Sequence, residues 1–283
     1  MAIRLPLLVA LAALLLFTRT EAGAARNSCL QCHRPHYQAK GSCVSCHKGD
    51  PRSDRLRIAH HDLVPARFSW YGIPDSPPLE RGNRLLETFA CRRCHATGGK
   101  GNRSASNLDR LPAGTTPGNL FDSIREPALL MPEFRFDDRQ ITDLVNALEA
   151  GGKEAGREGG KASAEPPQVV HFQGKEEDRD NVFVKQCGSC HRLLTRNLGG
   201  LGSGGIGPNL SGLLSEHYPR TAPGNASWRA DSLEKWLKNP RQAREQTTMR
   251  PVKLQREELA RLVAVLADAP VPVRLAAAPL APL

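Results

Sequence analysis

Two apolar stripes with the spacing of an α-helix lie in the middle of the chain and near its end. Each has apolar residues at positions i, i+3, i+4 and i+7, which places four side chains on one helix face. The first stripe also has a predicted N-terminal cap, because Asp137 is followed three residues later by Gln140. Both segments are predicted to be amphipathic helices. The stripes are Ile141, Leu144, Val145 and Leu148, and Leu259, Leu262, Val263 and Leu266.

The residues ahead of each stripe repeat as well. An apolar pair is followed by a proline and then by a methionine, and each stripe begins ten residues after its methionine. A repeat of this kind indicates two domains built on one plan. We place the first repeat at residues 79–150 and the second at residues 175–268. The landmarks are Leu120, Ile124, Pro127 and Met131, and Leu233, Leu237, Pro240 and Met249.

The remaining segments differ from the repeats in composition. Residues 25–78 contain six prolines, which predicts little regular structure. Residues 151–174 are predicted to form a flexible linker, and residues 269–283 a tail rich in Pro and Ala. The expected fold class is therefore mainly α, with a poorly structured module followed by two small all-α domains.

Residues 1–24 have the pattern of a signal peptide. Arg4 precedes a 13-residue apolar run from Leu5 to Phe17, and small residues follow at 22–24. The run is shorter than the roughly 20 apolar residues that a membrane span requires. The pattern therefore favours a cleaved leader and a periplasmic protein over an uncleaved N-terminal anchor.

The composition argues against a large core made of side chains alone. Phe, Trp and Tyr together make up 5% of the chain, which has 25 glycines and 22 prolines. Small domains of this kind usually depend on disulfides, metals or cofactors. The formal charge of +10 would on its own permit nucleic acid, an anionic membrane surface or an acidic protein as a partner.

All eight cysteines occur in the pattern Cys-x-x-Cys-His. Three chemistries compete for it: a disulfide framework, zinc sites and covalent haem attachment. His makes up only 9 of 283 residues, so chance would place one after all four pairs with odds on the order of one in a million, which favours haem. On a helical turn two such thiols can bond one porphyrin edge while the histidine binds the iron. The sites are Cys29, Cys32 and His33; Cys43, Cys46 and His47; Cys91, Cys94 and His95; and Cys187, Cys190 and His191.

With these four motifs the sequence resembles the multihaem c-type cytochromes. The resemblance implies four covalently bound haem c groups, with a compact dihaem module at residues 25–78 and a class I cytochrome c-like domain in each repeat. The second repeat matches that pattern better, because Gly207-Pro208-Asn209-Leu210 is similar to the loop whose proline carbonyl holds the proximal imidazole. The first repeat has no such proline, which leaves the orientation of His95 open.

Four proximal histidines call for four further axial ligands. Met131 and Met249 occupy equivalent places in the repeats and are the predicted thioether ligands, with an ordinary core methionine as the alternative. For the dihaem module, which has no methionine, the predicted ligands are His36 and His60, with His61 as a substitute for His60. The haem that His36 serves stays open.

Such a ligand set leaves no iron open, which suits electron transfer better than substrate chemistry. We expect a periplasmic tetrahaem relay that passes electrons from a low-potential bis-His pair to higher-potential His/Met haems. The resemblance implies redox partner proteins, among them a membrane quinol-oxidising respiratory complex with this chain as its cytochrome c subunit. The alternatives are a peroxidase- or reductase-type enzyme with one open iron, and a zinc-binding or cofactor-free interaction protein.

The predicted cofactors also change the charge balance. Removal of residues 1–24 leaves 37 basic and 28 acidic residues, a formal charge of +9. Four haems would add about eight propionate carboxylates, so the assembly with ferrous iron is close to neutral. Nucleic acid is therefore excluded from the expected partners.

Overall fold

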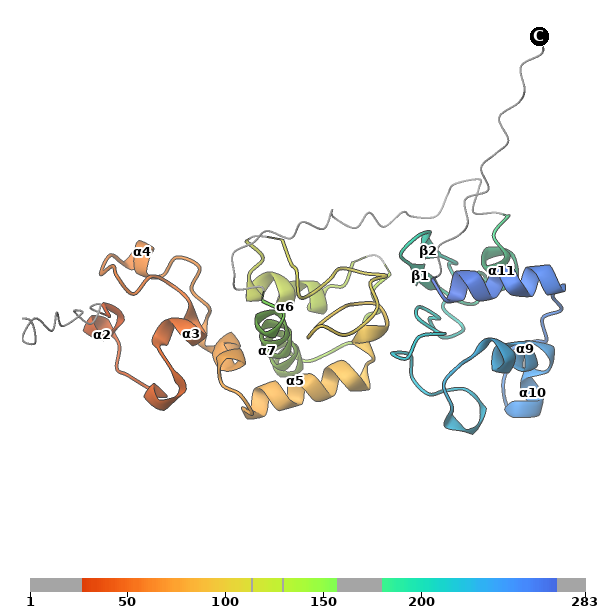
Figure 1. Cartoon of the computed structure of the whole chain (residues 1–283), viewed down its shortest axis with the longest axis horizontal. Helices are drawn as coiled ribbons and strands as arrows, with labels where there is room; N and C mark the ends of the chain where they lie inside the picture. Colours follow the sequence, from red (N-terminus) through yellow and green to blue (C-terminus); the bar gives the residue numbers. More distant parts are fainter. Residues whose placement is uncertain (1–26, 113, 129, 157–179, 269–283) are drawn as a thin grey trace, which may run out of the picture. The chain divides into compact units, whose positions relative to one another are not determined.

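The computed structural model describes residues 27–112, 114–128, 130–156 and 180–268. The predicted signal peptide, the C-terminal tail and most of the predicted linker lie outside the described residues. The chain divides into two compact units, Met1–Ala66 and Arg67–Leu283, and each is described by itself. The described residues are largely helical, as expected (Figure 1). None of their helices has both the length and the apolar character needed to cross a bilayer.

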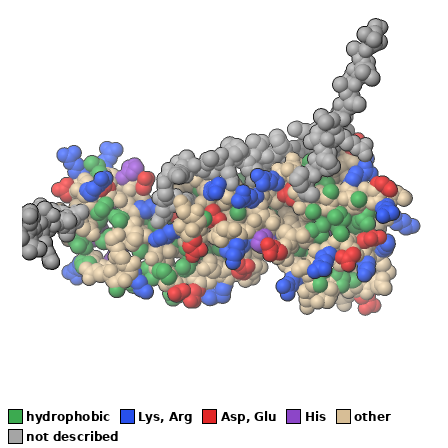
Figure 2. Space-filling model, in the orientation of Figure 1, with side chains coloured by type: hydrophobic (Ala, Val, Ile, Leu, Met, Phe, Trp, Pro, Cys, Tyr) green, Lys and Arg blue, Asp and Glu red, His purple; other side chains and the backbone are tan. Residues whose placement is uncertain are grey.

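The first unit consists of short helical turns joined by irregular loops, in agreement with the little regular structure predicted there (Figure 1). Val64 is the one fully buried hydrophobic side chain among its described residues, 27–66. Hydrophobic side chains instead reach the surface of this unit (Figure 2). The exposed set is Leu30, Tyr37, Leu56, Ile58 and Leu63. The elements are α2 (Cys29–Cys32), η1 (Gln38–Lys40), α3 (Cys43–His47) and α4 (Leu56–Ala59).

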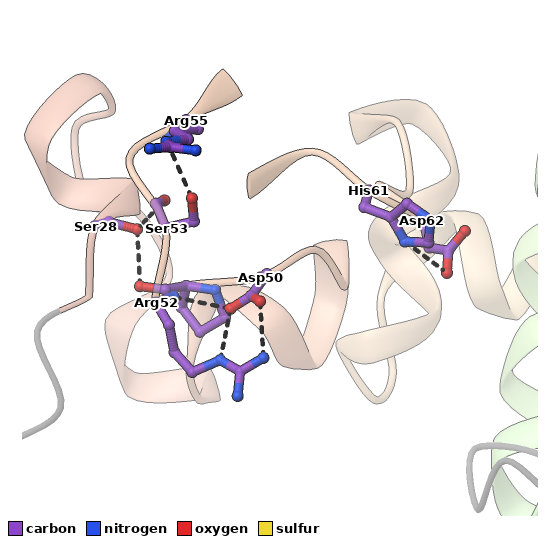
Figure 3. Close-up of polar contacts among 8 residues, drawn as sticks. Ser28, Asp50, Arg52, Ser53, Arg55, His61 and Asp62 are labelled. Carbon is purple, nitrogen blue, oxygen red and sulfur yellow. Dashed lines mark hydrogen bonds and ion pairs between the residues drawn. The ribbon is translucent and has the colours of Figure 1, made fainter. Parts of the chain in front are cut away.

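Polar contacts tie the start of this unit to a later loop (Figure 3). The Ser28 hydroxyl donates to the Pro51 carbonyl at 2.8 Å and also to the Ser53 carbonyl. Arg52 donates to the Asp50 carboxylate through Nε at 2.9 Å and Nη2 at 2.8 Å. These hydrogen bonds lower the pKa of Asp50 to about 2. The loop around residues 50–53 therefore anchors the turn that begins at Ser28.

Helices α5 (Pro77–Thr88) and α7 (Asp138–Glu154) pack together in the first repeat, with α6 (Pro117–Arg125) against α7 and η3 (Cys91–Arg93) after α5. The predicted cap is confirmed: the Gln140 N–H donates to the Asp137 carboxylate at 2.7 Å, and the Asp137 N–H donates to Gln140 Oε1 at 3.0 Å. All four residues of the predicted stripe are buried. The helix extends to Glu154, into residues that the sequence assigned to the linker.

Gly82 lets α5 and α7 approach backbone to backbone. A Cβ atom at this position would lie 2.0 Å from the Asp143 carbonyl oxygen. Arg81 binds the Asp143 carboxylate beside the crossing, with Nε at 2.6 Å and Nη2 at 2.8 Å. The Asp143 side chain is only 5% exposed, so this ion pair fixes the crossing from within the packed surface.

Residues 67–76 pack with the first repeat, although the sequence placed them in the segment 25–78. Helix η2 (Ala66–Gly72) buries Phe68 and Tyr71. The Tyr71 N–H donates to the side-chain oxygen of Asn146 at 3.1 Å. Phe68 contacts Phe121, with ring centroids 5.8 Å apart. Proline content continues across this boundary, so composition gave no sign of where the packing changes.

The second repeat contains a β-hairpin that the sequence did not indicate. Strands β1 (Leu193–Thr195) and β2 (Gly199–Leu201) are antiparallel, with Leu193 opposite Leu201. Two strands of three residues, one with two glycines, are too short to show an alternating pattern. Phe183 and Leu262 are fully buried in the same core. The other elements are α8 (Val182–Gln186), η6 (Pro223–Asn225), α9 (Ala230–Lys238), α10 (Pro240–Ala243) and α11 (Arg256–Leu266).

The substitution Gly82→Ala is expected to lower the free energy of unfolding by about 1–3 kcal/mol, because the new methyl group must displace the α7 backbone. Gly118→Ala in α6 is the matched control, since a Cβ there meets only the Thr116 hydroxyl oxygen at 3.5 Å. Alanine also favours a helix over glycine by about 1 kcal/mol. Denaturant unfolding measures both variants beside the parent chain. Equal stability of the two variants would contradict the backbone contact.

Candidate functional site

Each Cys-x-x-Cys-His motif forms one helical turn. The histidine N–H donates to the carbonyl of the first cysteine, at 2.9 Å for His33, 3.1 Å for His95 and 2.9 Å for His191. Helix α3 spans the whole of the remaining motif, Cys43–His47. Residues at i, i+3 and i+4 of such a turn share one face. All eight cysteines are free, so the structure contains none of the disulfides that the sequence left as an alternative.

A cavity of about 360 Å³ lies beside the motif of the first repeat. This volume is in the range of about 300–1,000 Å³ that is usual for small-molecule and cofactor sites. Cys91, Cys94 and His95 line it, and Met131 lines the same cavity. The structure thus brings the predicted thioether ligand to the site of its predicted histidine. The apolar lining includes Leu86, Phe89, Leu120, Ile124, Phe134 and Phe136.

A backbone carbonyl of Ser106 holds the imidazole of His95. His95 Nδ1 lies 2.8 Å from that oxygen, and because a carbonyl can only accept, Nδ1 carries the proton. The sequence left this orientation open, because the first repeat has no proline equivalent to Pro208. A usable signal was the pair Asn107-Leu108, which follows Ser106 as Asn209-Leu210 follows Pro208.

The predicted proline contact is confirmed in the second repeat. His191 Nδ1 donates to the Pro208 carbonyl at 2.8 Å. The hydrogen bonds around this contact match those around Ser106. In both loops the backbone N–H of the residue before Ser106 or Pro208 donates to the carbonyl of the second cysteine of the motif. The backbone N–H of the leucine two residues after Ser106 or Pro208 donates to the carbonyl of the residue that follows the motif histidine. These bonds join Ala105 to Cys94 (2.9 Å), Leu108 to Ala96 (2.9 Å), Gly207 to Cys190 (2.8 Å) and Leu210 to Arg192 (2.8 Å).

Burial sets the ionisation of these groups. It raises the pKa of Cys91 and of Cys187 to about 11, so both free thiols are protonated at neutral pH. Burial lowers the pKa of His95, and the hydrogen bond to Ser106 opposes that shift. A neutral imidazole whose Nδ1–H is held by a carbonyl presents the lone pair of Nε2, which is the form that binds a metal ion.

Met249 packs against the core cluster of the second repeat, which contains Cys187. The indole N–H of Trp236 donates to Met249 Sδ at 3.0 Å. Trp228 packs edge-on against Trp236, with ring centroids 5.7 Å apart. Both tryptophans also pack against the core cluster of this repeat. Trp236 in addition fixes the position of the thioether sulfur.

The histidines of the first unit lie in two pairs. The rings of His33 and His60 have centroids 6.0 Å apart, and those of His36 and His47 have centroids 5.6 Å apart. Metal–imidazole bonds are about 2 Å long, so two imidazoles on opposite sides of one metal have ring centres about 6 Å apart. His47 Nδ1 donates to the Val64 carbonyl at 3.2 Å, which leaves its Nε2 free. Each motif histidine of the first unit therefore has one other histidine at a distance that a shared metal would allow.

His61, the substitute considered for His60, points elsewhere. Its Nδ1 lies 3.2 Å from the Asp62 carboxylate and its side chain is 77% exposed (Figure 3). His60, its neighbour in the chain, is the residue that contacts the ring of His33.

These donor sets fit haem c. Each motif offers two thiols and an imidazole from one turn, and the first repeat adds an apolar cavity lined by a thioether. In the first unit each motif histidine has a second imidazole at a centroid distance compatible with a shared iron. The fit therefore rests on side chains that the fold has already brought together.

Residues 77–146 match the family described as "Cytochrome C oxidase, cbb3-type, subunit III". No curated protein and no solved structure matches the chain. The match covers the first repeat, whereas the sequence had suggested that the second repeat resembles a cytochrome c domain more closely. In the second repeat the carbonyl that holds the histidine lies 17 residues after His191, against 11 residues after His95, and the longer segment contains the β-hairpin. The chain therefore contains a c-type cytochrome domain, which implies covalently bound haem c and electron transfer with redox partner proteins.

Proposed function

We propose that the chain is a tetrahaem electron-transfer protein that is exported to the periplasm. The observation that carries the proposal is that all four Cys-x-x-Cys-His motifs form the same helical turn, although only one lies in the matched segment. The matching loop hydrogen bonds around His95 and His191 support a second cytochrome c-like domain. The leader pattern of residues 1–24 supports export. Bound haem would supply a reversible one-electron change at its iron.

In the first unit we propose two bis-His sites with crossed ligands. His60 serves the site of His33, and His36 serves the site of His47, which follows from the two ring distances. His36 lies three residues after His33 but contacts the ring of the other motif. The ring distance supports the proposal that His36 serves the site of His47, a choice that the sequence left open.

In the repeats we propose Met131 as the second ligand at His95 and Met249 as the second ligand at His191. Met131 lines the cavity of its histidine. Met249 packs in the core that contains Cys187, and the Trp236 N–H bound to its sulfur withdraws electron density from it. A thioether that donates less electron density favours the reduced metal, because the oxidised metal is stabilised more strongly by electron donation from its ligands. Thioether ligation itself raises the potential.

These ligand sets give the relay a direction. The bis-His sites at residues 25–78 would be the low-potential entry, and the His/Met sites of the repeats the higher-potential exit. Every axial position then has a protein ligand, which leaves no place for a substrate on the metal. The proposed partners are respiratory redox proteins. A membrane quinol-oxidising complex suits the entry side, and the family matched at residues 77–146 adds an oxidase to the partner classes.

The haem count can be tested by intact mass under denaturing conditions. The chain without its leader is expected to carry four haem masses, because thioether bonds survive unfolding whereas zinc does not. The double variant Cys187→Ala/Cys190→Ala should lose one haem mass and keep three. A mature chain with fewer than four haem masses, or a colourless protein, would contradict the tetrahaem proposal.

The ligand pairing can be tested with two neighbouring histidines. His60→Ala is expected to convert one of the four centres to a high-spin form that binds cyanide. His61→Ala should leave all four centres low-spin, because His61 contacts Asp62 instead. Electronic absorption and electron paramagnetic resonance spectra of both variants measure the outcome. The pairing fails if His61→Ala produces the high-spin centre.

The thioether ligands can be tested by spectroelectrochemistry. Met131→Ala and Met249→Ala should each remove one component of the far-red band of Met-ligated ferric haem. Each should also lower one midpoint potential, within the span of about 0.8 V that axial ligands control. A redox titration in which the two methionine-sensitive centres lie below the other two would reverse the proposed direction of the relay.

A further inference from the structure

Arg93 connects the motif of the first repeat to the loop of the second. It stands between Cys91 and Cys94, and its Nη1 donates to the Asn209 carbonyl at 3.3 Å. Its guanidinium carbon also lies 5.7 Å from the ring centre of Tyr218. The side chain thus lines the cavity of its own repeat and also contacts the second repeat through both a carbonyl and an aromatic ring.

The carbonyl that Arg93 binds is close to the second proximal histidine along the chain. Asn209 follows Pro208, whose own carbonyl accepts the Nδ1–H of His191 at 2.8 Å. Tyr218 donates its hydroxyl to the same Asn209 oxygen at 3.1 Å. One carbonyl beside Pro208 therefore receives two donors, one from each repeat.

The backbone of Arg93 is held at the same place. Asn102 Nδ2 donates to the Arg93 carbonyl at 2.9 Å and to Ser215 Oγ at 2.9 Å. A Cβ atom at Gly212 would lie 2.6 Å from the Arg93 carbonyl oxygen, and the φ of Gly212 is +71°. Only glycine fits both this approach and this backbone conformation. The contact between the repeats is therefore specific in position and not a loose surface encounter.

Among the described residues, the side chain of the neighbouring Arg92 makes its polar contacts within the first repeat. Arg92 donates through Nε to the Thr97 carbonyl at 3.2 Å and pairs with Glu87, both within the first repeat. Arg92 thus contacts the first repeat, whereas Arg93 contacts the second. Replacement of either arginine by glutamine removes one positive charge, so Arg92→Gln is a matched control for Arg93→Gln.

We propose that Arg93 is a positioning residue for His191: from the first repeat it fixes the Asn209 carbonyl, and through the Asn209 Cα, which joins this peptide group to the preceding one, it fixes the Pro208 carbonyl that orients the imidazole of the second repeat. The proposal rests on the proposed function in that His191 is taken as a haem ligand. If Arg93 has this role, the orientation of His191 in the second repeat depends on the packing of the first repeat around Arg93. Two donors on one carbonyl restrict its rotation, so loss of either loosens the Pro208 carbonyl and the His191 hydrogen bond with it.

The test compares Arg93→Gln, Tyr218→Phe and Arg92→Gln in the full holoprotein. Exchange of the His191 Nδ1 proton, followed by nuclear magnetic resonance in the reduced state, is expected to become about tenfold faster in Arg93→Gln, as for the loss of one charge-assisted hydrogen bond. Tyr218→Phe should act in the same direction without any change in charge. The midpoint potential of the centre that responds to Met249→Ala should shift in both variants. Arg92→Gln should leave the exchange rate unchanged.

An exchange rate in Arg93→Gln equal to that in Arg92→Gln, in a protein with a full haem content, would overturn the positioning role. A double-mutant cycle with Arg93→Gln/Tyr218→Phe adds a second criterion. Two donors that act through one carbonyl give non-additive effects on the exchange rate, so additive effects would contradict a shared route through Asn209. The haem mass at Cys187 and Cys190 is measured on the same samples. If no haem is attached to Cys187 and Cys190, the proposed function fails. The exchange rates of the His191 Nδ1 proton then still decide whether Arg93 positions His191.

Discussion

In both repeats the histidine of the motif donates its Nδ1–H to a backbone carbonyl at 2.8 Å. The rest of each site depends on this bond. It selects one tautomer, turns the ring so that Nε2 is the free donor, and does so with an acceptor that cannot ionise. The two flanking backbone bonds of each loop keep that acceptor in place. The helix pairs that surround the loops, such as α5 and α7, supply the rigid frame against which those bonds are made.

The two units support their histidines in different ways. The repeats use buried helix contacts, and Phe183 and Val145 are fully buried in their cores. The first unit has Val64 as its one fully buried hydrophobic side chain among the described residues, and it holds His47 through the carbonyl of that residue. Its described residues are held instead by polar contacts such as that of Ser28 with Pro51.

Much of this arrangement could be predicted from the sequence, and what could not has a physical reason. The helix stripes and the cap at Asp137 follow from side-chain type and spacing. The Pro208 contact followed instead from the resemblance of its loop to that of class I cytochrome c domains. Ser106 was missed because its role belongs to the backbone carbonyl, which every residue has. The pairing of His36 with His47 depends on how a short, irregular segment folds back on itself. The contact of Arg93 with Asn209 joins residues that are 116 positions apart, and no local pattern encodes it.

The unequal burial of the cysteines sets up a competition during maturation. Only a thiolate is readily oxidised, and burial holds the pKa of Cys91 and of Cys187 at about 11, so these thiols resist premature disulfide formation. Cys32 and Cys190 are exposed, so the pair in the second repeat joins a protected thiol to an accessible one. In an oxidising compartment such as the proposed periplasm, the exposed thiols are the ones that must be kept reduced until haem arrives. A thiol-reducing factor would therefore act on single exposed positions of these motifs, Cys32 and Cys190, in both units of the chain.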